Sequence, residues 1–421
     1  MLSSFCYRAY TIKCLDMKNS LPIESINMRN NISIGRKILY FLIYLSFLIS
    51  MKFWIGWEGR DMYLNWFIGI FSFIIILQNN IKLDFSFTNI LLVLCVLLTQ
   101  LYTGSRFGMW YILGFLPYVT IICLNDKDKI RCWEFITKWY GYLMIPSLIV
   151  FILCGIVELP SFGIQNAVAA DWAEESGYGK CKNYIFYMQS QFDNYGLRFN
   201  GPFLEPGHLG MMGAFLLFGN NFNFKKKGMI PILIAVCFTL SLAGYMLTLI
   251  GLVMILFYRK KIRAKHMLIC VLGLLGIYNF GVYFNDGDNL INEMILSRLE
   301  FDSETGFKGN NRVFGLTEIY YLGLYNDMKL LLYGYPHHIM EWLNENGSRG
   351  SGYMVYMCWN GLIGVIIASL LYIIVIFKTK ARFFAILSFI FVGFMFWQRC
   401  YPMWTSWIIC YIYSIVTEER R

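Results

Sequence analysis

The sequence is poor in charge: Asp, Glu, Lys and Arg make up only 15% of its 421 residues, whereas about 25% is usual for a soluble domain. Hydrophobic residues make up 57%, and the mean hydropathy is +0.52. These values exclude an ordinary soluble enzyme. The uncharged runs, each about 20 residues long, instead predict helices that cross a membrane.

Several common catalytic and metal-binding motifs are also missing. No two of the 12 cysteines form a CxxC pair, and seven of them lie inside apolar runs, where cysteine acts as a small hydrophobic residue. The chain has no P-loop, no GxSxG and no HExxH motif, so a nucleotide or zinc-protease site is not expected. We therefore expect no metal and no other cofactor.

The apolar runs predict an all-α polytopic integral membrane protein with about twelve transmembrane helices. The residues before Ile38 are polar and lack the apolar core of a signal peptide, and Met17 or Met28 could be the true start. The predicted organisation is a leader (1–37), spans one to five (38–157), a first long loop (158–205), spans six to nine (206–284), a larger loop (285–351), spans ten to twelve (352–416) and a tail (417–421).

The individual spans are expected near 38–56, 62–78, 87–102, 108–124, 139–157, 206–222, 228–242, 245–257, 267–284, 352–377, 383–397 and 404–416. Basic residues orient these spans, because 24 of the 36 Lys and Arg fall in the leader, the tail and alternate connectors. The positive-inside rule assigns that side to the cytoplasm. Both termini are therefore expected inside and both long loops outside, and the formal charge of +10 reflects membrane orientation and not nucleic-acid binding.

The first candidate site is the segment Leu197–Gly213, which reads LRFNGPFLEPGHLGMMG. Pro206 suits the first position of a helix, and Glu205 before it would lie against the positive helix end. A well-capped span is one interpretation. However, Arg198, Glu205 and His208 gather at the predicted outer boundary of the membrane, where ionisable residues are usually functional.

The second candidate site lies in the larger loop, in the segment Asn310–His338. Residues 316–324 predict an amphipathic helix, and the glycine and proline of 334–336 predict a turn that presents His337 and His338 together. Both histidines could be surface residues of this turn. An imidazole titrates near neutral pH, however, so one of them could take a proton from a hydroxyl group.

One arginine lies inside this second segment and another follows it. Arg312 precedes the predicted amphipathic helix, and Arg349 precedes the next span. Each alone could be a solvated loop charge, but arginine is the side chain best suited to hold a phosphate through paired donors. Arg106 and Arg399, at two tight outer turns, could add positive charge to the same outer rim.

The two segments resemble bacterial O-antigen polymerases of the Wzy type, within the O-antigen ligase-like superfamily. RFNGPFLEPGHLG looks like the arginine and F-x-E-P-G element of polysaccharide polymerases, and NNRVFG, LLLYGYPHH and GSGYMVYMCWNGLIG resemble the pattern around their large outer loop. The resemblance covers roughly Leu197–Val365. One departure is the turn after the seventh span, which reads SLAGY where ligase-type relatives tend to show an arginine.

The resemblance implies a GT-C-like architecture and a metal-independent glycosyltransferase that needs no nucleotide. Such an enzyme transfers an oligosaccharide from undecaprenyl diphosphate to another lipid-linked repeat unit, at the outer face of the bacterial cytoplasmic (inner) membrane. Donor and acceptor glycolipids and the lipid bilayer would be its partners. A chain-length regulator and a flippase are further candidate partners, and no nucleic acid is expected.

This chemistry assigns roles to the candidate residues. The acceptor hydroxyl needs a base, for which Glu205 is the first candidate and His337 or His338 the second. The departing diphosphate needs positive charge, which arginines supply without a metal. His208 would orient Glu205 or bind sugar. The predicted substrate-binding residues are Arg198, His208, Arg312 and Arg349.

Three other functions stay open. An O-antigen ligase would transfer finished glycan to the lipid A core, and a flippase or another secondary transporter would move the lipid-linked oligosaccharide. A transporter places charged residues near the membrane midplane, whereas the charges here avoid the predicted span centres. A non-catalytic scaffold would tolerate neutral residues in place of Glu205 and Arg312.

Overall fold

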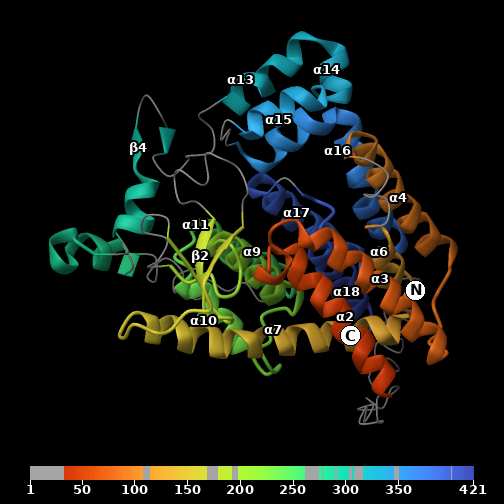
Figure 1. Ribbon diagram of the computed structural model, residues 1–421, viewed down its shortest axis with the longest axis horizontal. Helices are drawn as coiled ribbons and strands as arrows, with labels where there is room; N and C mark the ends of the chain where they lie inside the picture. The colour runs from red at the N-terminus through yellow and green to blue at the C-terminus, as the bar shows by residue number, and fades with distance from the viewer. Residues whose placement is uncertain are drawn as a thin grey trace, which may run out of the picture.

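The computed structural model is mostly helical and describes residues 33–107, 114–167, 179–191, 198–260, 275–276, 278–289, 292–302, 306–307, 316–345, 350–399 and 401–421 (Figure 1). Its helices are α2 (Ile34–Ser50), α3 (Arg60–Gln78), α4 (Phe87–Phe107), α6 (Leu116–Cys123), α7 (Asp126–Cys154), α9 (Pro206–Gly219), α10 (Met229–Phe238), α11 (Leu242–Tyr258), α13 (Leu316–Gly323), α14 (Met328–Tyr333), α15 (His337–Glu345), α16 (Gly352–Lys378), α17 (Arg382–Gln398) and α18 (Thr405–Glu419).

Strands are short and occur in the two long connectors. A three-stranded antiparallel sheet has the order β1-β2-β3, and a two-stranded sheet pairs β4 with β5. The strands are β1 (Ile164–Asn166), β2 (Lys180–Asn183), β3 (Met188–Ser190), β4 (Phe301–Asp302) and β5 (Gly306–Phe307).

Three of the described helices, α3, α7 and α16, are long and apolar enough to cross a membrane. The segment Phe87–Tyr102 of α4 and helices α10, α11 and α17 are apolar but shorter. A helix rises about 1.5 Å per residue, so the 10 residues of α10 extend about 15 Å, half of a bilayer core of about 30 Å. The fold agrees with the predicted all-α membrane protein, while the number of twelve spans and the GT-C-like architecture stay predictions.

One predicted span begins well after the start of the helix that the structure describes. The fifth was expected from 139 to 157, but α7 already begins at Asp126, because Asn125 caps it by accepting from the backbone N–H of Asp128 at 3.0 Å. Capping acts on the backbone whatever the hydropathy of the following turn, so the basic connector is helical too. Most of the span expected at 267–284 lies outside the described residues.

We call the end at which α2 begins and α18 ends the basic end. The side chains of Arg36 and Asp128 lie 3.4 Å apart there, and those of Arg420 and Asp126 lie 3.5 Å apart. These pairs tie the start of α2 and the end of α18 to the start of α7. The basic end is therefore held together by charged side chains from three helices.

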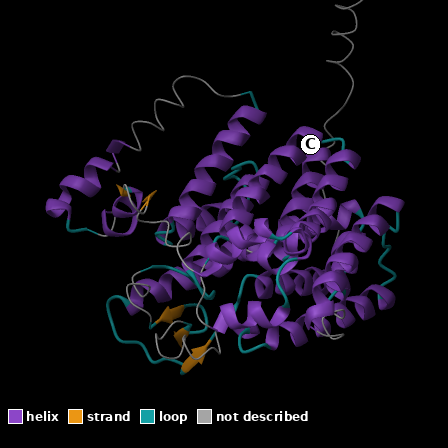
Figure 2. Ribbon diagram, turned by 90° about the horizontal axis from the view of Figure 1, so that it is seen from above, coloured by secondary structure: helices purple, strands orange, loops and turns teal. Residues whose placement is uncertain are grey.

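We call the opposite end, at which α7 ends and α9 begins, the loop end. The first long connector packs against it, since Phe199 N–H donates to Phe238 O at 3.1 Å and Leu204 N–H donates to Lys52 O at 3.3 Å. The three-stranded sheet lies at the edge of the bundle opposite to the C-terminus (Figure 2). The connector thus covers the ends of α2 and α10.

The larger loop forms a group of short helices on α16, seen at the top of Figure 1. Helix α13 confirms the helix predicted over residues 316–324. The turn between α14 and α15 approaches α16 closely, with Tyr335 N–H donating to Cys358 O at 2.8 Å. Gly334 (φ +77°) in this turn and Gly361 (φ +61°) in α16 adopt backbone conformations that favour glycine. Gly361 breaks α16 into two segments.

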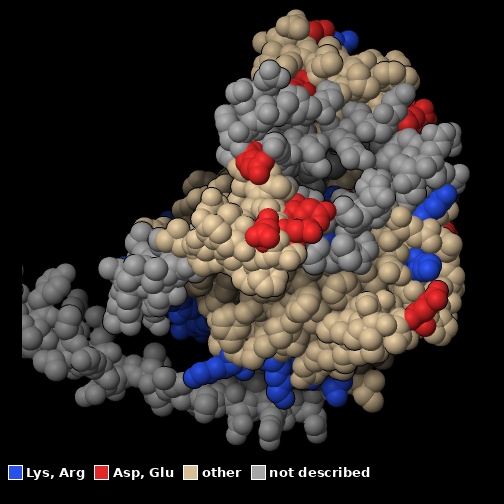
Figure 3. Space-filling view, turned by 90° about the vertical axis from the view of Figure 1, so that its left-hand side faces the viewer, with Lys and Arg blue, Asp and Glu red and all other residues tan. Residues whose placement is uncertain are grey.

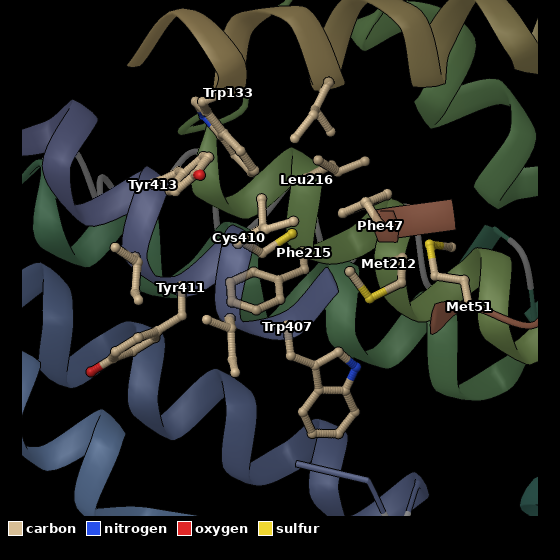
Figure 4. Close-up of a cluster of buried hydrophobic side chains, with 14 of the residues drawn as sticks. Phe47, Met51, Trp133, Met212, Phe215, Leu216, Trp407, Cys410, Tyr411 and Tyr413 are labelled. Carbon is tan, nitrogen blue, oxygen red and sulfur yellow. The ribbon is translucent and has the colours of Figure 1, made fainter. Parts of the chain in front are cut away.

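Helices α9 and α18 form the centre of the bundle. Every residue of α9 except Gly207 is buried, as is α18 from Thr405 to Ile415. A helix that is hydrophobic all round belongs in an interior, and both sequences have this pattern. The labelled side chains in Figure 4 come from α2 and the residue that follows it (Phe47, Met51), α7 (Trp133), α9 (Met212, Phe215, Leu216) and α18 (Trp407, Cys410, Tyr411, Tyr413). Packing of these two helices positions their N-terminal ends at the loop end.

Candidate functional site

Glu205 lies directly before the first turn of α9 and has extended backbone angles (φ −135°, ψ 147°). An acidic residue at this position commonly accepts hydrogen bonds from the first N–H groups of the helix. Here the side chain makes no such capping bond. Its carboxylate pairs instead with the guanidinium of Arg399. Helix capping therefore does not explain the position of the Glu205 carboxylate.

Arg399 belongs to the link between α17 and α18, which we call the α17–α18 link (residues 399–404). Its side chain is 16% exposed and that of Glu205 is 13% exposed, so the ion pair is mostly buried. The two residues are separated by 194 positions in the chain. The sequence motif that contains Glu205 could not reveal this partner, because the pair forms only when α9 and α17 pack together.

Two glycines make room for the pair. A Cβ on Gly207 would lie 3.0 Å from Nη2 of Arg399, closer than nearly all such contacts. A Cβ on Gly352, the first residue of α16, would collide with the backbone of Phe396 and Arg399. The starts of α9 and α16 can therefore approach the α17–α18 link closely.

His208 faces the same link through a different residue. Its side chain is buried, and its ring centre lies 5.6 Å from that of Trp404. Trp404 also stacks on Tyr401, with 5.4 Å between ring centres and 15° between planes. Glu205 and His208 are thus both turned toward the α17–α18 link, as a shared site requires. The predicted role of His208 in orienting Glu205 stays a prediction.

Arg198 is buried at the carboxyl end of α10, where its Nε donates to Thr239 O at 3.2 Å. A cation at this end of a helix satisfies a terminal carbonyl group, which is a structural role. Next to it, Ser241 caps α11 by accepting from Gly244 N–H at 3.3 Å. The tight turn predicted at SLAG is therefore wrong, because Leu242–Gly244 form the first turn of α11. A Cβ on Gly210 of α9 would lie 3.2 Å from Cα of Gly244, so this turn adjoins the first turns of α9.

The histidines of the larger loop lie on α15. Nδ1 of His337 is 3.0 Å from an oxygen of Glu341, and its ring centre is 5.5 Å from that of Trp359 in α16. His338, which follows it, is exposed. The structure therefore assigns His337 to the packing of α15 on α16 and leaves its role as a base a prediction. The predicted site residues that lie outside the described part of the chain are Arg312 and Arg349.

The loop end combines charges of both signs. Helices α9 and α18 begin beside the Glu205–Arg399 pair, and the N-terminal end of a helix carries partial positive charge. In the space-filling view, Asp and Glu gather in the middle and upper part of one face, whereas Lys and Arg lie mostly along its lower edge (Figure 3). Within the described residues, no group of three or more His, Cys, Asp and Glu side chains could hold a metal ion.

Comparison with known proteins identifies no relative of this chain. No protein-family model, no curated protein and no solved structure matches it. The resemblance to O-antigen polymerases therefore depends on the quoted sequence segments alone. What the geometry adds is a mostly buried carboxylate and guanidinium, brought together from α9 and the α17–α18 link at the end of the bundle where the long connectors attach.

Proposed function

We propose that this protein is a polysaccharide polymerase, which transfers an oligosaccharide from undecaprenyl diphosphate to another lipid-linked repeat unit. One observation carries the proposal: the carboxylate of Glu205 makes no capping bond to its own helix and pairs instead with a guanidinium at the loop end. In this proposal the basic end faces the cytoplasm, following the positive-inside rule. The loop end then faces the outer side of the bacterial cytoplasmic membrane.

Glu205 would act as the general base. The acceptor sugar hydroxyl attacks the anomeric carbon of the donor and loses its proton to an oxygen of Glu205. A new C–O bond forms as the bond between the anomeric carbon and the phosphate oxygen breaks. The electron pair of the broken bond stays on the lipid diphosphate. His337 is the second candidate for the base, through its imidazole.

The departing diphosphate needs positive charge near it, and preorganised donors supply this charge best in a site that excludes water. The N-terminal ends of α9 and α18 contribute partial positive charge. The sequence nominates Arg198, Arg312 and Arg349 as phosphate-binding side chains, and a planar guanidinium matches phosphate oxygens with two parallel donors.

The test is a gel of surface glycans and lipid-linked intermediates from a deletion strain complemented with wild-type protein or with Glu205→Gln. We expect a ladder with the wild type and single repeat units with the variant, at equal membrane abundance. Glu58→Gln is a matched control, because Glu58 is an exposed carboxylate that pairs with Arg60 at 3.1 Å.

Other outcomes would support other functions. Full-length polymer that stays on the lipid carrier in the deletion strain would indicate a ligase. Single repeats held at the cytoplasmic face would indicate a flippase. Near-normal polymer from Glu205→Gln would contradict the proposed site.

A further inference from the structure

The ion pair between Glu205 and Arg399 joins two groups that the proposed reaction needs at different moments. Before the reaction, the guanidinium is held against the carboxylate in a mostly buried position. Burial makes the charge of each group depend on the other, because an uncompensated charge is costly away from water. Any step that neutralises the carboxylate therefore changes what the guanidinium can bind.

On the basis of the proposed function, we propose that Arg399 is the catalytic residue that neutralises the leaving diphosphate. The acceptor hydroxyl gives its proton to Glu205, and the neutral carboxyl group no longer holds the guanidinium. Arg399 then binds the phosphate oxygen on which negative charge develops. The proton returns to water after product release, and the ion pair forms again.

The timing of this exchange favours catalysis. Only interactions that are stronger in the transition state than in the bound substrate accelerate the chemical step. In the resting site the charge of Arg399 is compensated by Glu205, so its attraction for a bound substrate is weakened. As the proton moves, the positive charge becomes available while negative charge builds up on the diphosphate.

The local packing keeps Arg399 close to the first turn of α9. Gly207 leaves space for the guanidinium, and Gly352 allows the start of α16 to contact the backbone of Arg399. Tyr401 and Trp404 of the same link form a stacked pair beside His208. The N-terminal ends of α9 and α16 lie beside Arg399, and their partial positive charge would add to the attraction for a diphosphate at this place.

A purely structural ion pair would hold α9 to the α17–α18 link without taking part in the reaction, and substitutions distinguish the two roles. Arg399→Lys keeps the positive charge but loses the paired donors. Arg399→Gln keeps hydrogen-bonding capacity toward Glu205 but loses the charge. A structural role needs mainly the contact between the two side chains, whereas a role on the diphosphate needs the charge.

The experiment measures kcat and KM of the purified full-length chain in phospholipid vesicles, with isolated lipid-linked repeat units as donor and acceptor. We expect Arg399→Gln to lower kcat by about 100-fold or more with little change in KM. Arg399→Lys should have a kcat between those of Arg399→Gln and the wild type, because it keeps the positive charge but loses the paired donors. In a protein that already carries Glu205→Gln, the further change Arg399→Gln should lower kcat only slightly. The effects of residues that act as one unit are not additive.

Three results would overturn this inference. The first is near-normal kcat for Arg399→Gln while Glu205→Gln is inactive, which leaves the proposed function intact. The second is a higher KM with unchanged kcat, which would assign Arg399 to ground-state binding. The third is full activity of Glu205→Gln, which contradicts the proposed function as well. Unfolding temperatures of all variants in detergent control for folding, and Arg399→Lys tests the charge if Arg399→Gln is unstable.

Discussion

The two ends of the helix bundle use buried carboxylates in different ways. At the basic end, Asp128 is 2% exposed and accepts hydrogen bonds from Tyr40 at 2.5 Å and from Asn125 at 2.7 Å, with Arg36 at 3.4 Å. At the loop end, Glu205 leaves its own helix uncapped and pairs with a guanidinium from a distant link. The first carboxylate ties helix ends together, whereas the second lies where the long connectors attach.

Glu418 repeats the pattern of the basic end. Its carboxylate accepts from Asn221 at 2.7 Å, from Arg421 at 2.9 Å and from Arg259 at 3.2 Å. These partners belong to the α9–α10 connector, the tail and the end of α11. A carboxylate with several partners from different elements stabilises their arrangement. The contrast teaches that buried charge alone does not mark a functional site, because both ends have it.

The largest expected effect on stability is at the basic end. Asp128→Ala should lower the free energy of unfolding by about 1 to 3 kcal/mol, because it leaves the buried hydroxyl of Tyr40 without its acceptor and removes the partner of the partly exposed Arg36. Thermal unfolding in detergent measures this loss, and the polymer formed per folded molecule should stay near the wild-type value. Asp61→Ala is the control, since its pair with Lys52 is much more exposed and is worth about 1 kcal/mol or less.

A loss of turnover in Asp128→Ala without a loss of stability would break the comparison between the two ends. It would place chemistry at the basic end.

Gly207→Ala should have the opposite effect, with lower turnover and little change in stability. Its Cβ would lie 3.0 Å from Nη2 of Arg399, so the guanidinium must shift by a few tenths of an ångström, and small misplacements of reacting groups are costly. We expect kcat to fall about 10-fold. The matched control is Gly393→Ala in α17, where a Cβ would meet no atom within 4 Å. Equal kcat values for the two variants would contradict the placement of the site.

The smallest expected effect concerns Lys226, in the connector between α9 and α10 at the basic end. Burial lowers the pKa of this amine from 10.5 to about 8. The folded state therefore binds fewer protons than the unfolded state between about pH 8 and 10.5, so this lysine's contribution to stability rises with pH in that window. Wild-type protein should gain about 1 kcal/mol relative to Lys226→Met from pH 8 to pH 9.

Denaturation in detergent at several pH values measures this difference. A constant difference between wild type and Lys226→Met from pH 8 to pH 9 would show that Lys226 has an ordinary pKa and keeps its positive charge in that range.

Local sequence signals predicted much of the helical structure. The apolar runs located α3, α11 and α17, and the amphipathic pattern located α13. Predictions from hydropathy were wrong at the start of α7, because capping by Asn125 begins the helix within a charged segment. The run at 228–242 yielded only the short α10, which ends at Phe238.

The sequence predicted only part of the candidate site. The sequence indicated Glu205 and His208, because they lie three positions apart beside a proline that starts a helix. Arg399 was assigned only to a positive rim, since nothing near it in the chain indicates a carboxylate partner. The same limit applies to Arg198, whose contact with Thr239 O depends on how the first long connector folds over α10.

The sequence by itself determined the class of protein, the position of most helices and the segment that contains the proposed catalytic carboxylate. Each of these depends on local composition, periodicity or capping, which act over a few helical turns. Only the tertiary structure decided that Glu205 pairs with Arg399 and does not cap α9. An ion pair between residues 194 positions apart forms because α9 and α18 are packed at the centre of the bundle, and that packing is a property of the whole chain.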